Sequence, residues 1–143
     1  MFSNSAKYAL KAVLYLALHS DDTKRVMIKD MHAKINVPQS YLAKLLQELS
    51  RHDLVSSTRG PKGGFYLSKA NRNEPLAKII HVIDGKKRLE TCLLSLEDCN
   101  KEKPCPLHKI FMPARSKLVQ SLEKKTIADL SLDLLNKKSF LPL

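Results

Sequence analysis

Residues 38–68, PQSYLAKLLQELSRHDLVSSTRGPKGGFYLS, place an amphipathic helix directly before a basic, glycine-rich turn. Pro38 suits the first turn of a helix, and the leucines behind it repeat at three- and four-residue spacing. Runs of β-branched and aromatic residues at 55–58 and 65–68 flank the turn and predict a β-hairpin. Three of the chain's four glycines lie in residues 59–64, so the tip needs backbone angles or close approaches that side chains forbid.

A shorter apolar pattern precedes this helix. Met27, Ile28, Met31 and Ile35 repeat at helical spacing and predict a helix that ends near Asn36. Two short helices separated by a tight break have the outline of a helix-turn-helix, and equally that of an ordinary helical hairpin. The basic hairpin that follows favours a winged helix, in which the second helix enters the major groove of DNA and the hairpin tip lies over the backbone or minor groove.

The remaining segments predict further helices and one long loop. Residues 5–18 are apolar on all faces, which is typical of a buried helix, and residues 73–85 predict a helix that Gly85 ends. Periodicity fades over residues 86–107. The last long helix carries a narrow stripe that fits packing against another helix, and Thr126 starts a final helix; the stripe is Phe111, Ala114, Leu118 and Leu122.

These patterns predict a mainly α fold with a small β-hairpin, a winged helix-turn-helix domain plus a long C-terminal dimerisation helix. A length of 143 residues is typical of one domain. We expect a DNA-binding domain over residues 1–85, a cysteine-containing sensor loop over residues 86–107, and the dimerisation helix with a C-terminal helix over residues 108–143. All three belong to a single structural unit.

The chain is strongly basic, with a net charge of +11 and a pI near 9.7. Residues 24–72 carry ten Lys or Arg and three Asp or Glu, a net of +7 in one third of the chain. This excess favours a polyanionic partner, either nucleic acid or an anionic membrane surface. No window approaches the 18 apolar residues of a membrane span, and the apolar run 12–18 lacks the flanks of a signal peptide. We expect a soluble, cytoplasmic protein with no membrane partner.

The candidate DNA contacts lie at the start of the second helix and at the hairpin tip. Polar side chains at a helix N-terminus can reach base edges, and a guanidinium favours a narrow minor groove. Exposed cations on a turn are more often simply solvated, although the glycines and the regional charge argue jointly against that. The candidates are Gln39 and Ser40 for bases, Tyr41 and Lys44 for backbone or base, Arg59 for the minor groove, Lys62 for a phosphate, and Gly60 and Pro61 at the tip.

Three cysteines and a histidine form the second candidate site. Six, five and two residues separate Cys92, Cys99, Cys105 and His108, in a segment too polar for a core. Thiolates suit zinc or iron-sulfur clusters, imidazole can complete either site, and the absence of a CxxC pair makes zinc less favoured. We expect Pro106 to start the last helix with Cys105 at its cap, where the helix dipole favours a thiolate. The alternative is three unrelated thiols.

The motifs carry a family resemblance. Ser5-Ala6-Lys7-Tyr8-Ala9, Gln39-Ser40-Tyr41-Leu42, Leu54-Val55-Ser56-Ser57 and above all Arg59-Gly60-Pro61-Lys62-Gly63-Gly64 resemble the Rrf-type bacterial regulators, which include IscR and NsrR. The resemblance covers nearly the whole chain. It implies a homodimer, paired through the long helix, that binds a roughly palindromic promoter operator in double-stranded DNA.

The same resemblance implies a [2Fe-2S] or [4Fe-4S] cluster on Cys92, Cys99 and Cys105, which an apo preparation can lack. His108 matches the fourth ligand of some members, whereas others recruit a side chain from the partner's first helix. The first helix here offers Lys7, Tyr8 and Lys11 and no acid, which favours His108. The six-residue gap after Cys92 is one longer than the family's commoner five, so the cluster type stays open.

No catalytic motif is evident, so we expect a regulator, of repressor type, rather than an enzyme. Two alternatives remain. One is a winged-helix regulator whose cysteines bind zinc or respond by thiol oxidation. The other is an iron-sulfur carrier or enzyme whose basic face binds an acidic protein.

Overall fold

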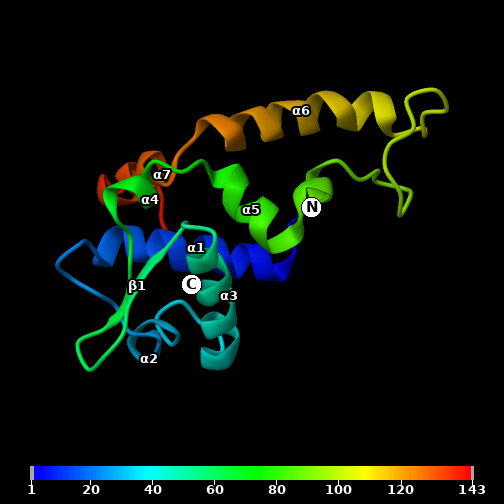
Figure 1. Ribbon diagram of the computed structural model, residues 1–143. Coiled ribbons are helices and arrows are strands. Elements are labelled where there is room, and N and C mark those ends of the chain that lie inside the picture. The colour runs from blue at the N-terminus through cyan, green and yellow to red at the C-terminus, as the bar shows by residue number, and fades with distance from the viewer. Residues whose placement is uncertain (1, 143) are drawn as a thin grey trace.

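A computed structural model of the chain, which describes residues 2–142, has helix α1 (Asn4–His19) at the centre of the fold (Figure 1). Ser3 caps this helix, since its hydroxyl accepts a hydrogen bond from the Ala6 N–H at 3.0 Å. Small alanines on α1 are fully buried and allow close approach. As the apolar pattern predicted, α1 is a buried helix; it packs against α3 (Gln39–Arg51), α5 (Leu76–Asp84) and α7 (Ile127–Leu135).

The two-helix unit forms, but its first helix is shorter than predicted. Helix α2 (Ile28–Met31) is a single turn, and residues 32–36 continue as hydrogen-bonded turns. Asn36 adopts a left-handed φ of 55°, a conformation that ends a helix. Met31 and Ile35 are both fully buried, so the predicted apolar stripe faces the core even though only one turn is regular helix.

The predicted hairpin is present as the antiparallel strands β1 (Ser56–Thr58) and β2 (Gly64–Tyr66), which together with residues 59–63 we call the wing. Val26 adds a third segment by pairing with Phe65 through two backbone hydrogen bonds of 2.9 and 2.8 Å. Two glycines make this geometry possible. A Cβ on Gly63 would lie 2.2 Å from the Thr58 carbonyl oxygen, and one on Gly64 would lie 2.6 Å from that of Val26.

Helix α4 (Lys69–Arg72), a single turn that the sequence did not predict, fastens the base of the wing. Asn71 is 4% exposed and lies inside a ring of polar groups. Its amide donates to the Asp53 carbonyl at 2.7 Å, and its Oδ1 accepts from the Ser56 hydroxyl at 2.7 Å and from the Ser68 N–H at 2.9 Å. These hydrogen bonds therefore hold the two ends of the wing in a fixed position relative to the helices.

After α5 the chain leaves the core and later returns to it. The short 3-10 helix η1 (Lys86–Leu89) lies inside the segment predicted as loop, and it forms because Leu89 is buried at 4% exposure. Helix α6 (His108–Lys124) crosses above the body, and α7 packs back against α1 through the fully buried Ile127 (Figure 1). Thr126 and Asp129 form the capping box that starts α7, as predicted.

The predicted start of the long helix was wrong by two residues. Helix α6 begins at His108 with Leu107 as its N-cap, so Cys105 is not at the cap. Residues 105–108 instead form a tight turn, in which the His108 N–H donates to the Cys105 carbonyl at 3.0 Å, and α-helical bonding starts with the Phe111 N–H on the Leu107 carbonyl at 2.9 Å. None of the helices in residues 2–142 is both long and apolar enough to cross a bilayer.

Candidate nucleic-acid interface and cysteine site

The start of α3 is open to solvent. Gln39, Ser40 and Lys44 are exposed on its first turns, where the sequence placed base and backbone contacts. Tyr41 points elsewhere, because its hydroxyl hydrogen-bonds to the Ser5 hydroxyl and its ring packs edge-on against Tyr8, with centroids 5.8 Å apart. Tyr41 thus fixes α3 on α1, and Gln39, Ser40 and Lys44 are left facing outward.

The wing tip is equally open. Arg59, Gly60, Pro61 and Lys62 are all exposed, and the Gly63 N–H closes the turn on the Gly60 carbonyl at 2.9 Å. Gly60 has a φ of 104°, in the region that L side chains rarely adopt. Two cationic side chains are therefore presented at a tip whose backbone can approach a flat or charged surface closely.

The wing and α3 enclose two shallow grooves. One lies between the wing and the start of α3 and includes Gln39, Lys29 and the wing glycines. The other lies between the wing and the second half of α3 and includes Gln47, Arg51 and Arg59. Figure 1 shows α2, the start of α3 and the wing tip on one side of the molecule. This surface is basic and polar, which suits a polyanionic partner.

Arg25 is a residue of this surface that motif analysis missed. Its guanidinium lies 4.6 Å from the centroid of the Tyr66 ring, its Nε donates to the Thr58 hydroxyl at 3.3 Å, and its Nη1 donates to the Asp22 carbonyl at 2.6 Å. Arg25 therefore contacts both strands of the wing and stabilises their position. Its only signal in the sequence was membership of the basic region 24–72.

Arg72, counted in the same basic region, has a different role. Its guanidinium donates to the Ala17 and Ser20 carbonyls at 2.9 and 2.6 Å, and so supplies hydrogen-bond donors to carbonyl groups at the C-terminal end of α1. The Ser20 hydroxyl also accepts from the Leu67 N–H at 3.1 Å. The regional charge excess therefore overstates the charge available to a partner.

The cysteine loop, residues 86–107, brings two of its three thiols into contact near the start of α6. Cys92 and Cys105 have their Sγ atoms 3.6 Å apart, and Cys99 also hydrogen-bonds to Cys92. Two sulfur ligands at about 2.3 Å from one tetrahedral ion stand about 3.8 Å apart, so the first pair has the spacing of ligands on a shared metal ion. All three thiols are half-buried and free.

The fourth candidate ligand is less clearly placed. The His108 N–H donates to the Cys105 carbonyl at 3.0 Å, which fixes the backbone of His108 beside the thiols, but its imidazole is not part of the thiol contacts. Within residues 2–142, no three His, Cys, Asp or Glu side chains already form a group that could hold a metal ion. The donor set fits a thiolate-bound centre, and the final ligand geometry is not preformed.

The backbone around Cys92 stabilises its thiolate. The N–H groups of Leu94 and Ser95 donate to the sulfur and, with smaller contributions from Cys105 and Cys99, lower the pKa of Cys92 to about 7. The thiolate is the form that binds metals and reacts with oxidants. The loop thus prepares Cys92 for coordination or for thiol chemistry.

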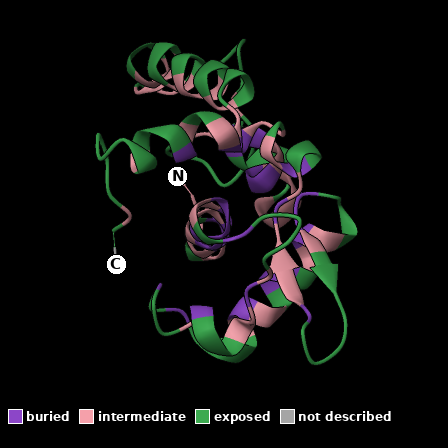
Figure 2. Cartoon of the chain, turned by 90° about the vertical axis from the view of Figure 1, so that its left-hand side faces the viewer, coloured by how far each residue is buried: buried purple, intermediate pink, exposed green. Residues whose placement is uncertain are grey.

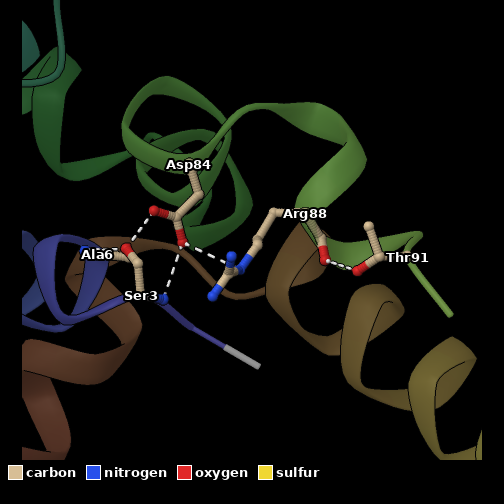
Figure 3. A network of polar contacts seen from close by, with 5 residues as sticks. All are labelled: Ser3, Ala6, Asp84, Arg88 and Thr91. Atoms are coloured by element: carbon tan, nitrogen blue, oxygen red, sulfur yellow. Dashed lines mark hydrogen bonds and ion pairs between the residues drawn. The ribbon is translucent and has the colours of Figure 1, made fainter. Parts of the chain in front are cut away.

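Two groups attach the cysteine loop to the rest of the chain. Arg115 of α6 donates to the Glu90 carbonyl at 2.7 Å, a tertiary contact for which the sequence has no local signal. Just before the loop, the Asp84 carboxylate accepts from the N–H and the hydroxyl of Ser3, and its Oδ2 lies 4.0 Å from Arg88 Nε (Figure 3). The loop is therefore connected both to α6 and to the N-terminus of α1.

A comparison with protein families gives one match over most of the chain. The Rrf2 family model, described as an iron-dependent transcriptional regulator, matches residues 2–133. An inferred HTH-type transcriptional regulator of Aquifex aeolicus is 33% identical over 132 residues, covering 91% of this chain and 90% of the relative. The HTH-type transcriptional regulator IscR of Yersinia pestis is 29% identical over 128 residues, covering 90% of this chain and 77% of that protein.

Solved structures share the fold. The T. potens IscR structure superposes with a TM-score of 0.72 at 22% identity, covering 99% of this chain and 93% of that chain. CymR of B. subtilis, described as a global cysteine regulator, gives a TM-score of 0.72 at 24% identity, covering 92% and 96% of the two chains. The predicted fold class is confirmed by these likenesses.

Proposed function

The chain belongs to the Rrf2 family of helix-turn-helix transcription regulators, and we propose that it is a cytoplasmic homodimer whose binding to a palindromic promoter operator depends on an iron-sulfur cluster. Membership of the family makes it a DNA-binding regulator rather than an enzyme. The observation that carries the cluster proposal is the 3.6 Å approach of the free thiols of Cys92 and Cys105, on a loop that also carries the free thiol of Cys99 and is attached to α6.

The DNA contacts we propose are those exposed around α3 and the wing. Gln39 and Ser40 meet base edges, Lys44 and Lys62 meet phosphates, and Arg59 enters the minor groove. Gly60 and Pro61 let the tip approach the duplex, while Tyr41 acts mainly by holding α3 in place. The exposure of these residues, and the position of α2, the start of α3 and the wing tip on one side of the molecule (Figure 1), support this assignment.

The proposed dimer forms through α6. None of the residues of this helix, His108–Lys124, is buried in the single chain, and Figure 2 shows it as an uncovered layer beside the body. Phe111, Leu118 and Leu122 are half-buried and Ile110 is 75% exposed, so apolar surface remains for a second copy. Residues 1–85 then bind DNA, residues 86–107 sense, and residues 108–143 carry the dimer helix and α7.

We propose that Cys92, Cys99 and Cys105 hold the cluster, with His108 as the fourth ligand. A bound cluster supplies redox and ligand-exchange chemistry that responds to oxidants or nitric oxide. The chain's own part is to bring the thiols together, to stabilise the Cys92 thiolate, and to connect the loop to α6. A change in loop order then shifts the dimer helix and the spacing of the two DNA-binding surfaces.

The experiment is anaerobic purification followed by visible absorption and by iron and sulfide analysis, beside a Cys92→Ala, Cys99→Ala, Cys105→Ala triple variant. The proposal expects iron, sulfide and absorption in the wild type that the triple variant lacks. A colourless wild type free of iron would overturn it. Because Cys92 and Cys105 lie 3.6 Å apart, zinc content and a reducible Cys92–Cys105 disulfide would then be measured in that protein as signs of the rival mechanism.

A further inference from the structure

One guanidinium holds the two sides of the cysteine loop to α6. The Nη1 atom of Arg115 lies 2.7 Å from the Glu90 carbonyl oxygen, 3.5 Å from that of Thr91 and 3.7 Å from Cys99 Sγ. The guanidinium also lies 5.9 Å from the centroid of the Phe111 ring, one turn earlier on α6. Arg115 therefore contacts a stretch directly before the first cysteine and the second cysteine itself.

These acceptors lie on two segments that pair with each other. Thr91 and Asp98 form an isolated antiparallel bridge, and the Cys92 N–H donates to the Glu97 carbonyl at 3.2 Å. Arg115, which belongs to α6, contacts both of these paired segments. Any change in the separation of the two segments must therefore either stretch the Arg115 contacts or move the helix that carries the residue.

The surroundings of Arg115 also fit a coupling role. It lines a cavity together with Arg88, Phe111 and Cys92, between η1, the loop and α6. Hydrogen bonds to a ligating sulfur tune the electron density of that sulfur and fix its orientation. All three contacts come from Nη1, and the rigid guanidinium plane fixes the direction of that donor, whereas the ammonium of lysine is a compact charge on a flexible stem.

We propose that Arg115 is the positioning residue that transmits the state of the cysteine site to the dimer helix. The inference rests on the proposed function, and it adds the route by which the loop acts on α6. Arg115 positions Cys99 and the segment before Cys92, and it touches no DNA. Its removal uncouples the loop from α6 while both DNA-binding surfaces remain intact.

The test compares Arg115→Gln and Arg115→Lys with the matched control Lys117→Gln. Lys117 is exposed two residues further along α6, so its replacement removes one positive charge from the same helix without touching the loop contacts. All variants are prepared as full-length protein, and far-UV circular dichroism confirms the fold. If Arg115→Gln does not fold, Arg115→Lys carries the test.

Two readouts are measured on each protein. The first is the ratio of operator affinities with cluster and without it, which for the wild type we expect to be about 5- to 150-fold. In Arg115→Gln and Arg115→Lys this ratio falls by about 2- to 30-fold, and in Lys117→Gln it stays near the wild-type value. The second is hydrogen exchange of the Cys92 amide in cluster-free protein, which is faster in both Arg115 variants and unchanged in the control.

The outcomes separate the two hypotheses. If the wild-type ratio is one, the proposed function fails. If the wild type shows a clear ratio and the Arg115 variants keep it, the inference fails while the proposed function stands. A fall in the ratio that is equally large in Lys117→Gln also overturns the inference, because general charge on α6 would then explain the effect.

Discussion

Gly64→Ala should detach the wing from the body by breaking its pairing with Val26. The new Cβ would lie 2.6 Å from the Val26 carbonyl oxygen, so the two hydrogen bonds between Val26 and Phe65 must open. Each is worth about 0.5–1.5 kcal/mol, and a side chain at the φ of 144° adds about 1–2 kcal/mol of backbone strain. The free energy of unfolding should therefore fall by about 2–5 kcal/mol, or by less where local opening of the wing relieves the clash.

Gly60→Ala is the matched control. Gly60 also has a positive φ, 104°, but an added Cβ would have no atom within 4 Å. This variant should lose only the strain of about 1–2 kcal/mol. Urea unfolding followed by far-UV circular dichroism gives both free energies. Fluorescence anisotropy with a DNA duplex selected by the protein from a random pool gives the affinities.

The detached wing should also change the salt dependence of DNA binding. If Lys62 no longer meets a phosphate and Arg59 no longer enters the minor groove, the slope of log affinity against log salt should fall by about one or more for each DNA-binding surface in Gly64→Ala. Equal stability and equal salt slopes in Gly64→Ala and Gly60→Ala would refute the argument that close approach to Val26 holds the wing.

Three further predictions concern single side chains. Asn71→Ala should lower the unfolding free energy by about 2 kcal/mol or more, because it removes a buried amide with three partners, whereas exposed Asn73→Ala should change it by about 0.5 kcal/mol or less in urea melts. Lys62→Ala should reduce the salt slope of DNA binding by about one for each DNA-binding surface, and an unchanged slope would remove Lys62 from the interface. The Thr126 N–H holds the pKa of Asp129 below its usual value, so this carboxylate stabilises the fold above about pH 4 and loses that effect as the pH falls through its folded pKa. Asp129→Asn should thus be less stable than wild type at pH 7 and equal to it in acid, and a deficit independent of pH would contradict the assignment.

Local signals in the sequence predicted much of the fold. The leucine stripe of α3, the glycines of the wing and the Thr126 capping box each specify their own backbone, since the information lies within a few neighbouring residues. A similar signal was present but unused at α4, where Ser68 and Asn71 form a capping box. Helix α2 was overestimated because a helical apolar spacing is satisfied by buried turns as well as by regular helix.

The candidate site was less predictable wherever it depends on distant contacts. Nothing near Tyr41 indicates that its hydroxyl pairs with that of Ser5, and nothing near Arg115 points to Glu90, 25 residues away. The cysteine spacing predicted metal or cluster ligands, and that assignment stays a prediction, whereas the 3.6 Å approach of Cys92 to Cys105 depends on how the whole loop folds back on α6. Residue types suggest the chemistry of a site, and tertiary structure decides which groups come into contact.

Cluster control of DNA binding is tested most directly by the operator affinity of one anaerobic preparation, measured with its cluster and again after the cluster has been removed by a chelator. The proposed function predicts that the two affinities differ by about 5- to 150-fold at the same salt concentration. It also predicts that the difference disappears in the Cys92→Ala, Cys99→Ala, Cys105→Ala variant. Equal affinities in the wild type would contradict the claim that the cysteine loop controls DNA binding.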